Sequence, residues 1–349
     1  MKIPENFNIN KLNISQTVQF LGLILATGIL LVLAYIITIL NTPVLDSTQQ
    51  EFRIKSGASV QEIADSLAEK AIINDPEKFI LAVKIKRKSR KLKAGYYSTE
   101  NVDNYSQLIS LLANNQQHTI KVTIPEGSTI REISKIISPY FNFSDSTFLA
   151  LTQNREFIKK LDLKVERLEG YLFPDTYYFS PDAGPGQIIT KMVKTLFDKI
   201  SPDLKSRIYN SKYSFHEILT LASIVEGECI LDKERRIVSS LYHNRLNRRM
   251  HLNADPTIQY IIDDGPRRLL KKDLAIKSPY NTYKNYGLPP APVNNPGLKS
   301  IKAAANPAST DYIYMVAKGN GEHAFTSNYD EFLEHKQAFQ EYRQQVNNQ

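Results

Sequence analysis

The sequence GASVQEIADSL at residues 57–67 recurs in altered form as GSTIREISKII at residues 127–137. Each copy follows a short alternating run, FRIK or HTIKVTI, that is typical of a β-strand. Ser59 and Glu62 in the first copy have the spacing of a capping box, and a threonine and a glutamate repeat that spacing in the second. Both copies therefore predict a strand, a glycine turn and a helix, which indicates an α+β fold.

A second helix and a returning strand are predicted after the first copy. Residues 76–86 place Phe79, Ile80 and Val83 on one side of a helix, and LKAGYYSTE at 92–100 is typical of a strand. The resulting order of strand, helix, helix and strand over residues 51–117 resembles a LysM module, a small carbohydrate-binding fold. A spacer domain that binds nothing is the alternative, because one fold can host many functions.

Residues 18–40, VQFLGLILATGILLVLAYIITIL, form an uncharged apolar run that is long enough to cross a bilayer. A cleavable signal peptide would have a shorter apolar region followed by a small-x-small site, which the sequence NTPV after the run fits poorly. Lys2 and Lys11 precede the run, and Arg53 is the first basic residue after it. The positive-inside rule then predicts residues 1–17 in the cytoplasm and the main body, beyond a linker at 41–50, outside it.

The charge and the rare residue types limit the classes of site. The chain has 44 basic and 36 acidic residues, a net charge of +8, which favours a polyanionic neighbour, although mildly basic chains are common. The basic run KIKRKSRKLK at 84–93 contains no aromatic residue, so anionic headgroups or a wall polymer fit it better than nucleic acid. A solvated helix face and loop is the simplest interpretation of this run. The single cysteine, Cys229, excludes an internal disulfide, and the six histidines form no HxH or HxxxH pair, so no metal site is predicted.

A candidate acid lies in the predicted helix FHEILTLASIVEGECI at 215–230. At roughly 100° per residue, Phe215, Leu219 and Ala222 lie within about 40° of Glu226. An apolar stripe disfavours an ionised carboxylate, so we expect Glu226 to be neutral near neutral pH. A neutral carboxyl aimed at a cleft is what general acid catalysis of glycoside cleavage requires.

Two further observations limit this hypothesis. Glu228 lies about 200° around the helix from Glu226, on the same side as Glu217, so the two neighbouring glutamates are not predicted to form a catalytic pair. The alternative for Glu226 is a carboxylate satisfied by a buried arginine such as Arg245.

Motifs that combine aromatic and polar residues surround this helix. EGYLFPDTY at 169–177 has the aromatic and carboxylate groups that bind sugars, and a tight structural corner is the equal alternative. Proline-rich sequence at 278–297 predicts a stiff loop suited to lining a cleft. YIYMVA at 312–317 predicts a buried strand, and HAFT at 323–326 predicts the second strand of a hairpin.

Seven motifs occur in one order along the chain: LEGYLFPDTYYF, LASIVEGE, HNRL, LNADPTIQY, SPYNTY, GLPPAPVNNPGLKSIKAAANPA and YMVAKGNGEHAFT. With them the chain closely resembles the MltG (YceG-like) endolytic peptidoglycan transglycosylases, from the apolar helix to about residue 345. The resemblance implies a membrane-anchored lyase with a LysM-like subdomain ahead of an α+β catalytic domain at 118–345. Such an enzyme cleaves MurNAc–GlcNAc bonds within nascent strands, forms 1,6-anhydroMurNAc ends and terminates strand elongation.

The resemblance also implies roles for residues. The glutamate of the family's SIVE motif matches Glu226, which is expected to be catalytic, and Gly227 departs from the longer residue expected at that place. No cofactor is implied. Asp175 and Asp255 are the best placed to orient sugar amides or Glu226. The predicted substrate contacts, each of which has a structural role as its alternative, are Glu169, Tyr171, Asp175, Asn244, Arg245, Asp255, Gln259, Tyr280, Asn281 and Tyr283.

The expected location is the bacterial cytoplasmic (inner) membrane, with the catalytic domain on the periplasmic side. The expected partners are peptidoglycan strands, the membrane and peptidoglycan synthases, with no nucleic acid. Two other functions stay open. One is a glycan hydrolase in which Asp175, Asp255 or Glu169 activates water. The other is a wall-binding membrane scaffold without catalysis.

Overall fold

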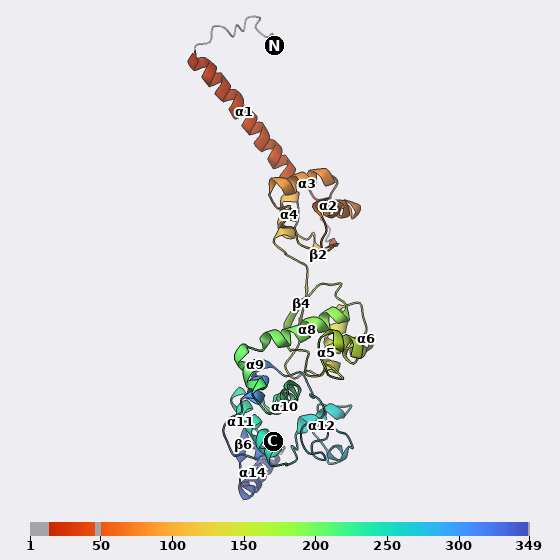
Figure 1. Ribbon diagram of the computed structural model, residues 1–349, viewed down its shortest axis with the longest axis vertical. Helices are drawn as coiled ribbons and strands as arrows, with labels where there is room; N and C mark the ends of the chain where they lie inside the picture. Colours follow the sequence, from red (N-terminus) through yellow and green to blue (C-terminus); the bar gives the residue numbers. More distant parts are fainter. Residues whose placement is uncertain (1–13, 46–49, 348–349) are drawn as a thin grey trace. The chain divides into compact units, whose positions relative to one another are not determined.

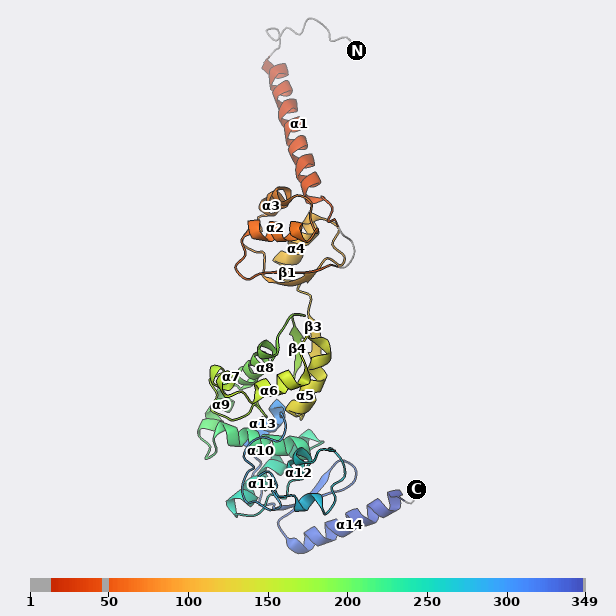
Figure 2. The ribbon, with the colours of Figure 1, turned by 90° about the vertical axis from the view of Figure 1, so that its right-hand side faces the viewer.

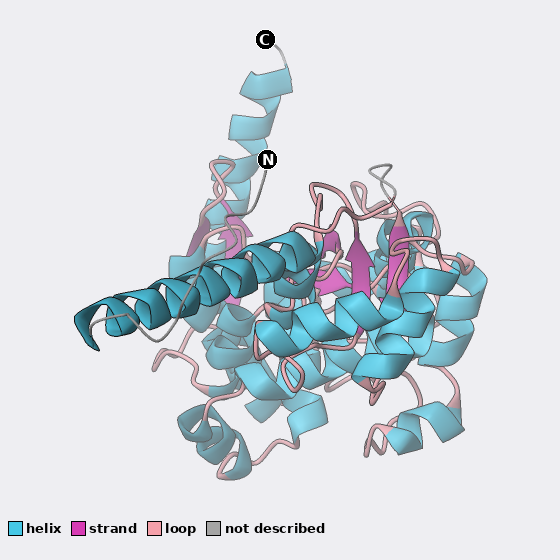
Figure 3. Ribbon diagram, turned by 90° about the horizontal axis from the view of Figure 1, so that it is seen from above, coloured by secondary structure: helices cyan, strands magenta, loops and turns pink. Residues whose placement is uncertain are grey.

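A computed structural model describes residues 14–45 and 50–347 and divides the chain into a first unit at 1–119 and a second at 120–349. Figure 1 labels many of the helices and strands. The first unit has one antiparallel two-stranded sheet and the second has two, all accompanied by helices (Figure 3). The predicted α+β class is therefore confirmed.

Helix α1 (Ile14–Leu40) is long and apolar enough to cross a membrane over Thr17–Leu40. These 24 residues span roughly 36 Å, more than the roughly 30 Å of a bilayer core. Side chains from Val18 to Leu33 are exposed on all sides of the helix, as lipid contact requires. The hydroxyls of Thr27 and Thr38 donate to helix carbonyls at 2.8 Å, so neither is left unpaired in an apolar surrounding.

The segment after α1 packs on the first unit, although a linker was predicted there. Ile39 is 1% exposed, and the amide of Val44 donates to the carbonyl of Asp103 at 3.0 Å. The amide of Leu45 donates to the carbonyl of Ile72 at 2.9 Å. Residues 41–45 are therefore held against the unit, while the rest of the predicted linker, up to residue 49, lies outside the described residues.

The first unit has the predicted order of strand, helix, helix and strand (Figure 2). β1 and β2 pair antiparallel, with Phe52 opposite Tyr97 in a buried pair. Both halves of the capping box at Ser59 are present, which explains where α2 begins. The likeness to a LysM module stays a prediction. The elements are β1 (Glu51–Ile54), α2 (Val60–Glu69), α3 (Pro76–Ile85), β2 (Gly95–Ser98) and an additional helix, α4 (Tyr105–Ala113).

The basic run at 84–93 is largely an exposed loop after α3, as its simplest interpretation predicted. Lys86 is the exception. Its ammonium donates to the carbonyl and hydroxyl of Ser106 and to the hydroxyl of Ser110, each at 2.9 Å. Burial lowers the pKa of Lys86. This lysine therefore joins α3 to α4 and is not part of the solvated charge.

The second unit begins with the other copy of the repeat. β3 (Ile120–Thr123) leads through Gly127 to α5 (Ile130–Ile137), whose capping box at Thr129 is complete. Gly127 has a φ of 78°, close to the 79° of the equivalent Gly57, and this left-handed conformation suits glycine. β3 pairs antiparallel with β4 (Thr176–Phe179). Around them lie α6 (Asp145–Thr152), α7 (Arg155–Lys160), α8 (Pro185–Lys199) and α9 (Pro202–Tyr209).

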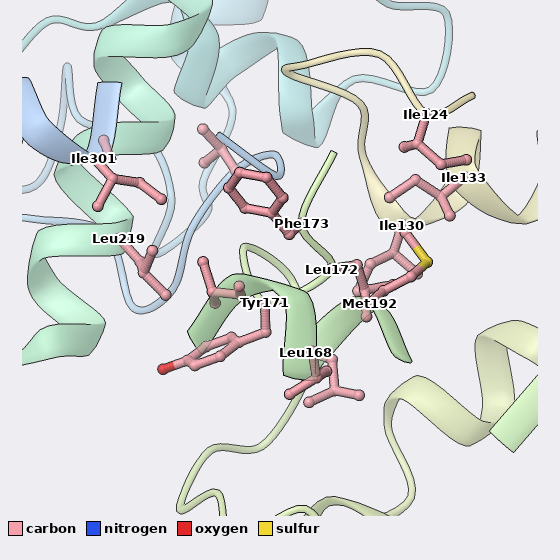
Figure 4. Packing of buried hydrophobic residues seen from close by; sticks show 14 of the residues in the cluster. Ile124, Ile130, Ile133, Leu168, Tyr171, Leu172, Phe173, Met192, Leu219 and Ile301 are labelled. Carbon is pink, nitrogen blue, oxygen red and sulfur yellow. The ribbon is translucent and has the colours of Figure 1, made fainter. Parts of the chain in front are cut away.

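Helix α10 (Phe215–Glu228) lies in the core of the second unit, against α11 (Arg235–Asn247), α12 (Asp255–Ile261) and α13 (Leu298–Ala305). All its residues from Ile218 to Val225 are buried. Figure 4 shows Leu219 of this helix beside Ile301 of α13, in the same cluster as Leu172 and Met192. Because α10 is buried on every side, its helical periodicity does not show which of its faces borders a functional site.

The predicted hairpin near the C-terminus is confirmed as β5 (Tyr314–Ala317) and β6 (His323–Thr326). Its first strand is half-buried along its length, so the prediction of a fully buried strand was wrong. Helix α14 (Tyr329–Asn347) covers the hairpin, with the rings of Phe332 and Tyr314 stacked at 4.9 Å.

Candidate functional site

The second unit contains a cleft of about 770 Å³ between α5, the C-terminal end of α10 and α12. This volume is within the range of about 300–1,000 Å³ that is usual for ligand sites. Two kinds of charge face it. Carboxyl groups come from α10, α12, the loop after α12, the sequence before β4 and, through Glu132, α5, and cationic groups come from α5 and residue 167. The charged lining residues are Glu169, Glu228, Asp255, Glu132, Asp263, Arg131, Lys135 and Arg167.

Glu228 is the last residue of α10, because Cys229 takes an extended conformation that ends the helix. Its carboxyl accepts a hydrogen bond from the Tyr242 hydroxyl at 2.9 Å. Burial raises the pKa of Glu228 to about 7, and the nearby Asp255 carboxylate contributes to that rise. The Tyr242 bond and the charge of Arg245 act in the opposite direction. A carboxyl that is partly protonated at neutral pH and lines a cleft is suited to general acid catalysis.

Asp255 begins α12 on the same cleft, and the phenol of Tyr283 donates to its carboxylate at 2.5 Å. Burial raises the pKa of Tyr283, so the phenol keeps its proton. The hydroxyls of Thr257 and Thr282 lie 2.9 Å apart and join the same two segments. Asp255 and Tyr283 are 28 residues apart in the sequence, and this contact joins their two motifs into one wall.

Glu169 is 4% exposed and lines the inner part of the cleft. It accepts the amide of Ile130, the first residue of α5, at 2.9 Å and the side-chain amide of Asn295 at 3.0 Å. Burial raises the pKa of Glu169 to about 7, although these bonds and the charge of Arg167 oppose the change. The residue thus fixes the start of α5 at the cleft.

The side chain of Glu226 is 6% exposed and forms a buried ion pair. One oxygen accepts from the Arg235 guanidinium at 2.9 Å, and the other accepts from the Gly297 amide at 2.9 Å. Both oxygens thus accept hydrogen bonds from donors within the protein. Glu226 is also not among the described residues that line the cleft. The buried-arginine alternative therefore describes these contacts, with Arg235 in place of Arg245.

Gly227 separates the two glutamates and packs against α12. A methyl group on Gly227 would approach the ring of Pro256 to 2.7 Å, closer than real side chains do. Any side chain at this position therefore requires Pro256, or the helix that it begins, to shift. This close approach brings Glu228 and Asp255 to one side of the cleft.

The structure does not bring Tyr171 or Asp175 to the cleft. Tyr171 is buried in the core (Figure 4), and its hydroxyl lies 3.0 Å from His216 Nδ1. Asp175 forms an ion pair with Lys199 at 2.8 Å, and that bond holds the pKa of Asp175 below its usual value. Both side chains stabilise the corner that the sequence EGYLFPDTY forms.

Asn244 and Arg245 have structural partners as well. The amide nitrogen of Asn244 donates to the carbonyls of Thr310 and Tyr312 at 2.8 and 3.0 Å. Arg245 is buried, and its Nε donates to the carbonyl of Ile313 at 2.7 Å. Together they hold α11 against the segment that leads into β5.

Gln259, Tyr280 and Asn281 are the remaining predicted contacts, and of these only Gln259 lines the cleft. Gln259 lines it, and its carbonyl oxygen accepts the amide of Arg267 at 3.1 Å, which fixes the loop after α12. The ring of Tyr280 packs at 5.0 Å from that of Tyr260, which lines the cleft. Asn281 is fully buried and donates to two carbonyls of the preceding loop at 3.1 and 2.8 Å.

From the sequence, neither Glu228 nor the cationic residues of the cleft were predicted to line a site. The second copy of the repeat carried a signal for two of them. Arg131 and Lys135 are four residues apart on α5, whose Ile133 and Ile137 are buried, so both cations must face outward. Glu126, just before this helix, was missed too, and burial followed by the charge of Glu226 raises the pKa of Glu126.

No group of three or more His, Cys, Asp or Glu side chains that could hold a metal ion occurs among residues 14–45 and 50–347.

Residues 52–338 match the model of the YceG-like family. An endolytic murein transglycosylase of Bacillus subtilis (strain 168) is 34% identical over 84% of this chain and 85% of its own length. A protein of the same name from Streptococcus pneumoniae (serotype 2, strain D39) is 32% identical over 76% of this chain and 53% of its own length. The crystal structure of a putative yceG-like protein from Listeria monocytogenes has a TM-score of 0.56 at 32% identity, over 83% of this chain and 99% of that one.

Proposed function

Because this chain belongs to the YceG-like family, we propose that it is an endolytic murein transglycosylase, a lyase that cuts MurNAc–GlcNAc bonds within peptidoglycan strands. The observation that carries the proposal is Glu228, a carboxyl that lines the cleft with a pKa of about 7. The names of the Bacillus and Streptococcus relatives give the reaction class. Cleavage within nascent strands would create 1,6-anhydroMurNAc ends and terminate their elongation.

Glu228 supplies the proton in this mechanism. It donates to the oxygen that links MurNAc to GlcNAc, and the leaving sugar departs as positive charge develops on the MurNAc ring. The Asp255 carboxylate, held by Tyr283, lines the same cleft and stabilises that charge. The ionised Glu228 then takes the proton of the C6 hydroxyl of the same MurNAc, whose oxygen closes on C1. Glu228 is protonated again, and no water enters the reaction.

Glu226 is the alternative acid, because the sequence predicts it. Its ion pair with Arg235 and its bond from the Gly297 amide favour a structural role. Variants of the two glutamates separate these assignments, as argued in the Discussion.

The membrane location rests on α1, which is long and apolar enough to serve as a single-pass anchor. The basic residues Lys2 and Lys11 before it support an N-terminus on the cytoplasmic side. Catalysis would then occur outside the cytoplasmic membrane, in the periplasm, close to the site of strand synthesis. Peptidoglycan synthases are the partners that this location favours.

Product mass tests the reaction. The full chain in detergent should release, from un-crosslinked strands, internal fragments that end in 1,6-anhydroMurNAc, as read by mass spectrometry. Fragments heavier by one water, with reducing MurNAc ends, would instead establish a hydrolase in which Asp255 or Glu169 activates water. Strand binding without any fragments would favour the scaffold.

The rate of cleavage should fall about tenfold per pH unit above pH 7, because the raised pKa of Glu228 of about 7 sets the loss of its acid form. Initial rates from pH 5 to 9 at constant ionic strength measure this. Glu169 also has a pKa of about 7, so the Glu169→Gln variant is the control. Its profile should keep the same alkaline limb, and a rate that stays constant up to pH 9 would contradict Glu228 as the acid.

A further inference from the structure

Two cations on the α5 wall of the cleft have no ionic partner. Arg131 and Lys135 are exposed, line the cleft and are one helical turn apart, on the same side of α5. Within the described part of the chain, no carboxylate oxygen lies within 4.0 Å of the charged nitrogens of either residue. The wall therefore presents two positive charges that the protein itself does not neutralise.

The nearest acidic residue in the sequence is committed elsewhere. Glu132 lies between the two cations, but its carboxylate accepts the amide of Thr129 at 2.8 Å and the hydroxyl of Thr129 at 2.9 Å. These bonds form the capping box that begins α5. Glu132 also lines the cleft, but these two bonds hold its carboxylate at the start of the helix.

The third cation of the cleft differs from these two. Arg167 donates to the Tyr260 hydroxyl at 3.2 Å, and its charge acts on the buried carboxyl of Glu169. Arg167 therefore belongs to the internal charge balance of the site. Arg131 and Lys135 are left as the cations available to a ligand.

We propose that Arg131 and Lys135 bind carboxylates of the stem peptide that MurNAc carries, so that the protein prefers peptide-bearing strands to peptide-free ones. The inference rests on the proposed function, because it names the substrate for the same cleft. The acid wall with Glu228 and Asp255 would receive the sugar ring, while the α5 wall receives the anionic substituent. Carboxylates occur both on the stem peptide and, once the peptide is removed, on the lactyl group itself, and the experiment distinguishes these two sources.

The test compares the full chain with its Arg131→Ala/Lys135→Ala variant in detergent on three strands. The strands carry native stem peptides, stem peptides whose carboxylates are amidated, or no peptide after amidase treatment. For the wild type we expect kcat/KM to be about tenfold higher on native strands than on the other two, an effect that increasing salt reduces. The variant should lose this preference through a higher KM, with kcat little changed.

Two control variants separate the effect of these charges from general effects. Lys164→Ala/Lys194→Ala removes two exposed positive charges of the second unit that do not line the cleft, and it should keep the preference. Arg131→Lys/Lys135→Arg keeps both charges and should keep most of it. If the alanine variant does not fold, Arg131→Gln/Lys135→Gln replaces it.

Three results would overturn the inference: an equal ratio of rates on native and peptide-free strands in wild type and variant, an equal loss on both strands, or a loss confined to peptide-free strands. An equal loss would assign the cations to a group that both strands share. A loss confined to peptide-free strands would assign them to the lactyl carboxylate, which is free only once the peptide is removed. Strand binding in a Glu228→Gln background gives the same comparison without cleavage. The inference therefore remains testable even if the wild type cleaves no strand, a result that would contradict the proposed function alone.

Discussion

Glu228→Gln is expected to lower the rate of strand cleavage about a thousandfold or more, because general acid catalysis contributes typically 10²–10⁴-fold. Glutamine has nearly the same shape, and its carbonyl oxygen still accepts the Tyr242 hydroxyl. The loss would therefore reflect the missing proton and not a changed fold. Release of anhydro fragments per unit time measures the rate.

The matched control is Glu226→Gln, two residues earlier in the same helix. Folded Glu226→Gln protein should keep cleavage within about tenfold of the wild type, since its side chain does not line the cleft. The opposite result, with Glu226→Gln inactive while folded and Glu228→Gln active, would restore Glu226 as the acid.

A pH series of the free energy of unfolding shows that the Glu228→Gln variant is folded. The folded-state pKa of Glu228 is raised from 4.5 to about 7, so the folded wild type loses stability as pH rises through that interval. The glutamine variant lacks this loss. It should match the wild type near pH 4.5 and exceed it by up to about 3 kcal/mol above pH 7, at about 1.4 kcal/mol per pKa unit.

Arg235→Ala is expected to destabilise the second unit by about 3–5 kcal/mol, because it leaves the Glu226 carboxylate buried without its cation. The same substitution also removes the donor to Ser300 and the ion pair with Asp232 at 3.0 Å. Urea unfolding of the full chain in detergent, followed by near-ultraviolet circular dichroism, measures the change.

Two further variants show whether Arg235→Ala destabilises the protein through the loss of the positive charge of Arg235. Arg155→Ala removes an exposed arginine 4.0 Å from Glu166 and should leave the free energy of unfolding unchanged within error. Arg235→Ala/Glu226→Gln should be more stable than Arg235→Ala alone, because the uncompensated charge is then gone. A double variant no more stable than the single one would show that the lost packing of Arg235, and not its charge, dominates.

Local signals in the sequence predicted several elements well. The capping boxes at Ser59 and Thr129 placed α2 and α5, and the turn residues before HAFT placed the hairpin. Hydroxyl and carboxylate spacing determines such helix starts within four residues, so no tertiary information is needed.

Helical periodicity could not decide between Glu226 and Glu228 as the acid. Helical periodicity assumes that one face is buried, but Ile218–Val225 are all buried, so the angle between Glu226 and Glu228 did not tell which faces the cleft. The surroundings of the two glutamates depend on residues that approach them through the tertiary fold. Arg235 and Gly297 contact Glu226, and Asp255 lies near Glu228. The close packing of α12 on Gly227 places Asp255 near Glu228.

Polar residues in the motifs shared with the family predicted substrate contacts less well. Asn244 and Asn281 donate their amides to backbone carbonyls of irregular segments. Long loops contain many carbonyls without partners in secondary structure, and side-chain amides satisfy them. From sequence alone, such an asparagine is indistinguishable from one that binds a sugar amide.

The packing of residues 39–45 on the first unit limits how far that unit can move from the helix. Ile39 is buried in that unit while the helix residues before it are long enough for the bilayer, so no slack chain separates the two. The first unit would then stay at the membrane surface and follow every tilt of the helix. In a membrane, the first unit would therefore reach only a thin layer above the lipid, and it would move by lateral diffusion.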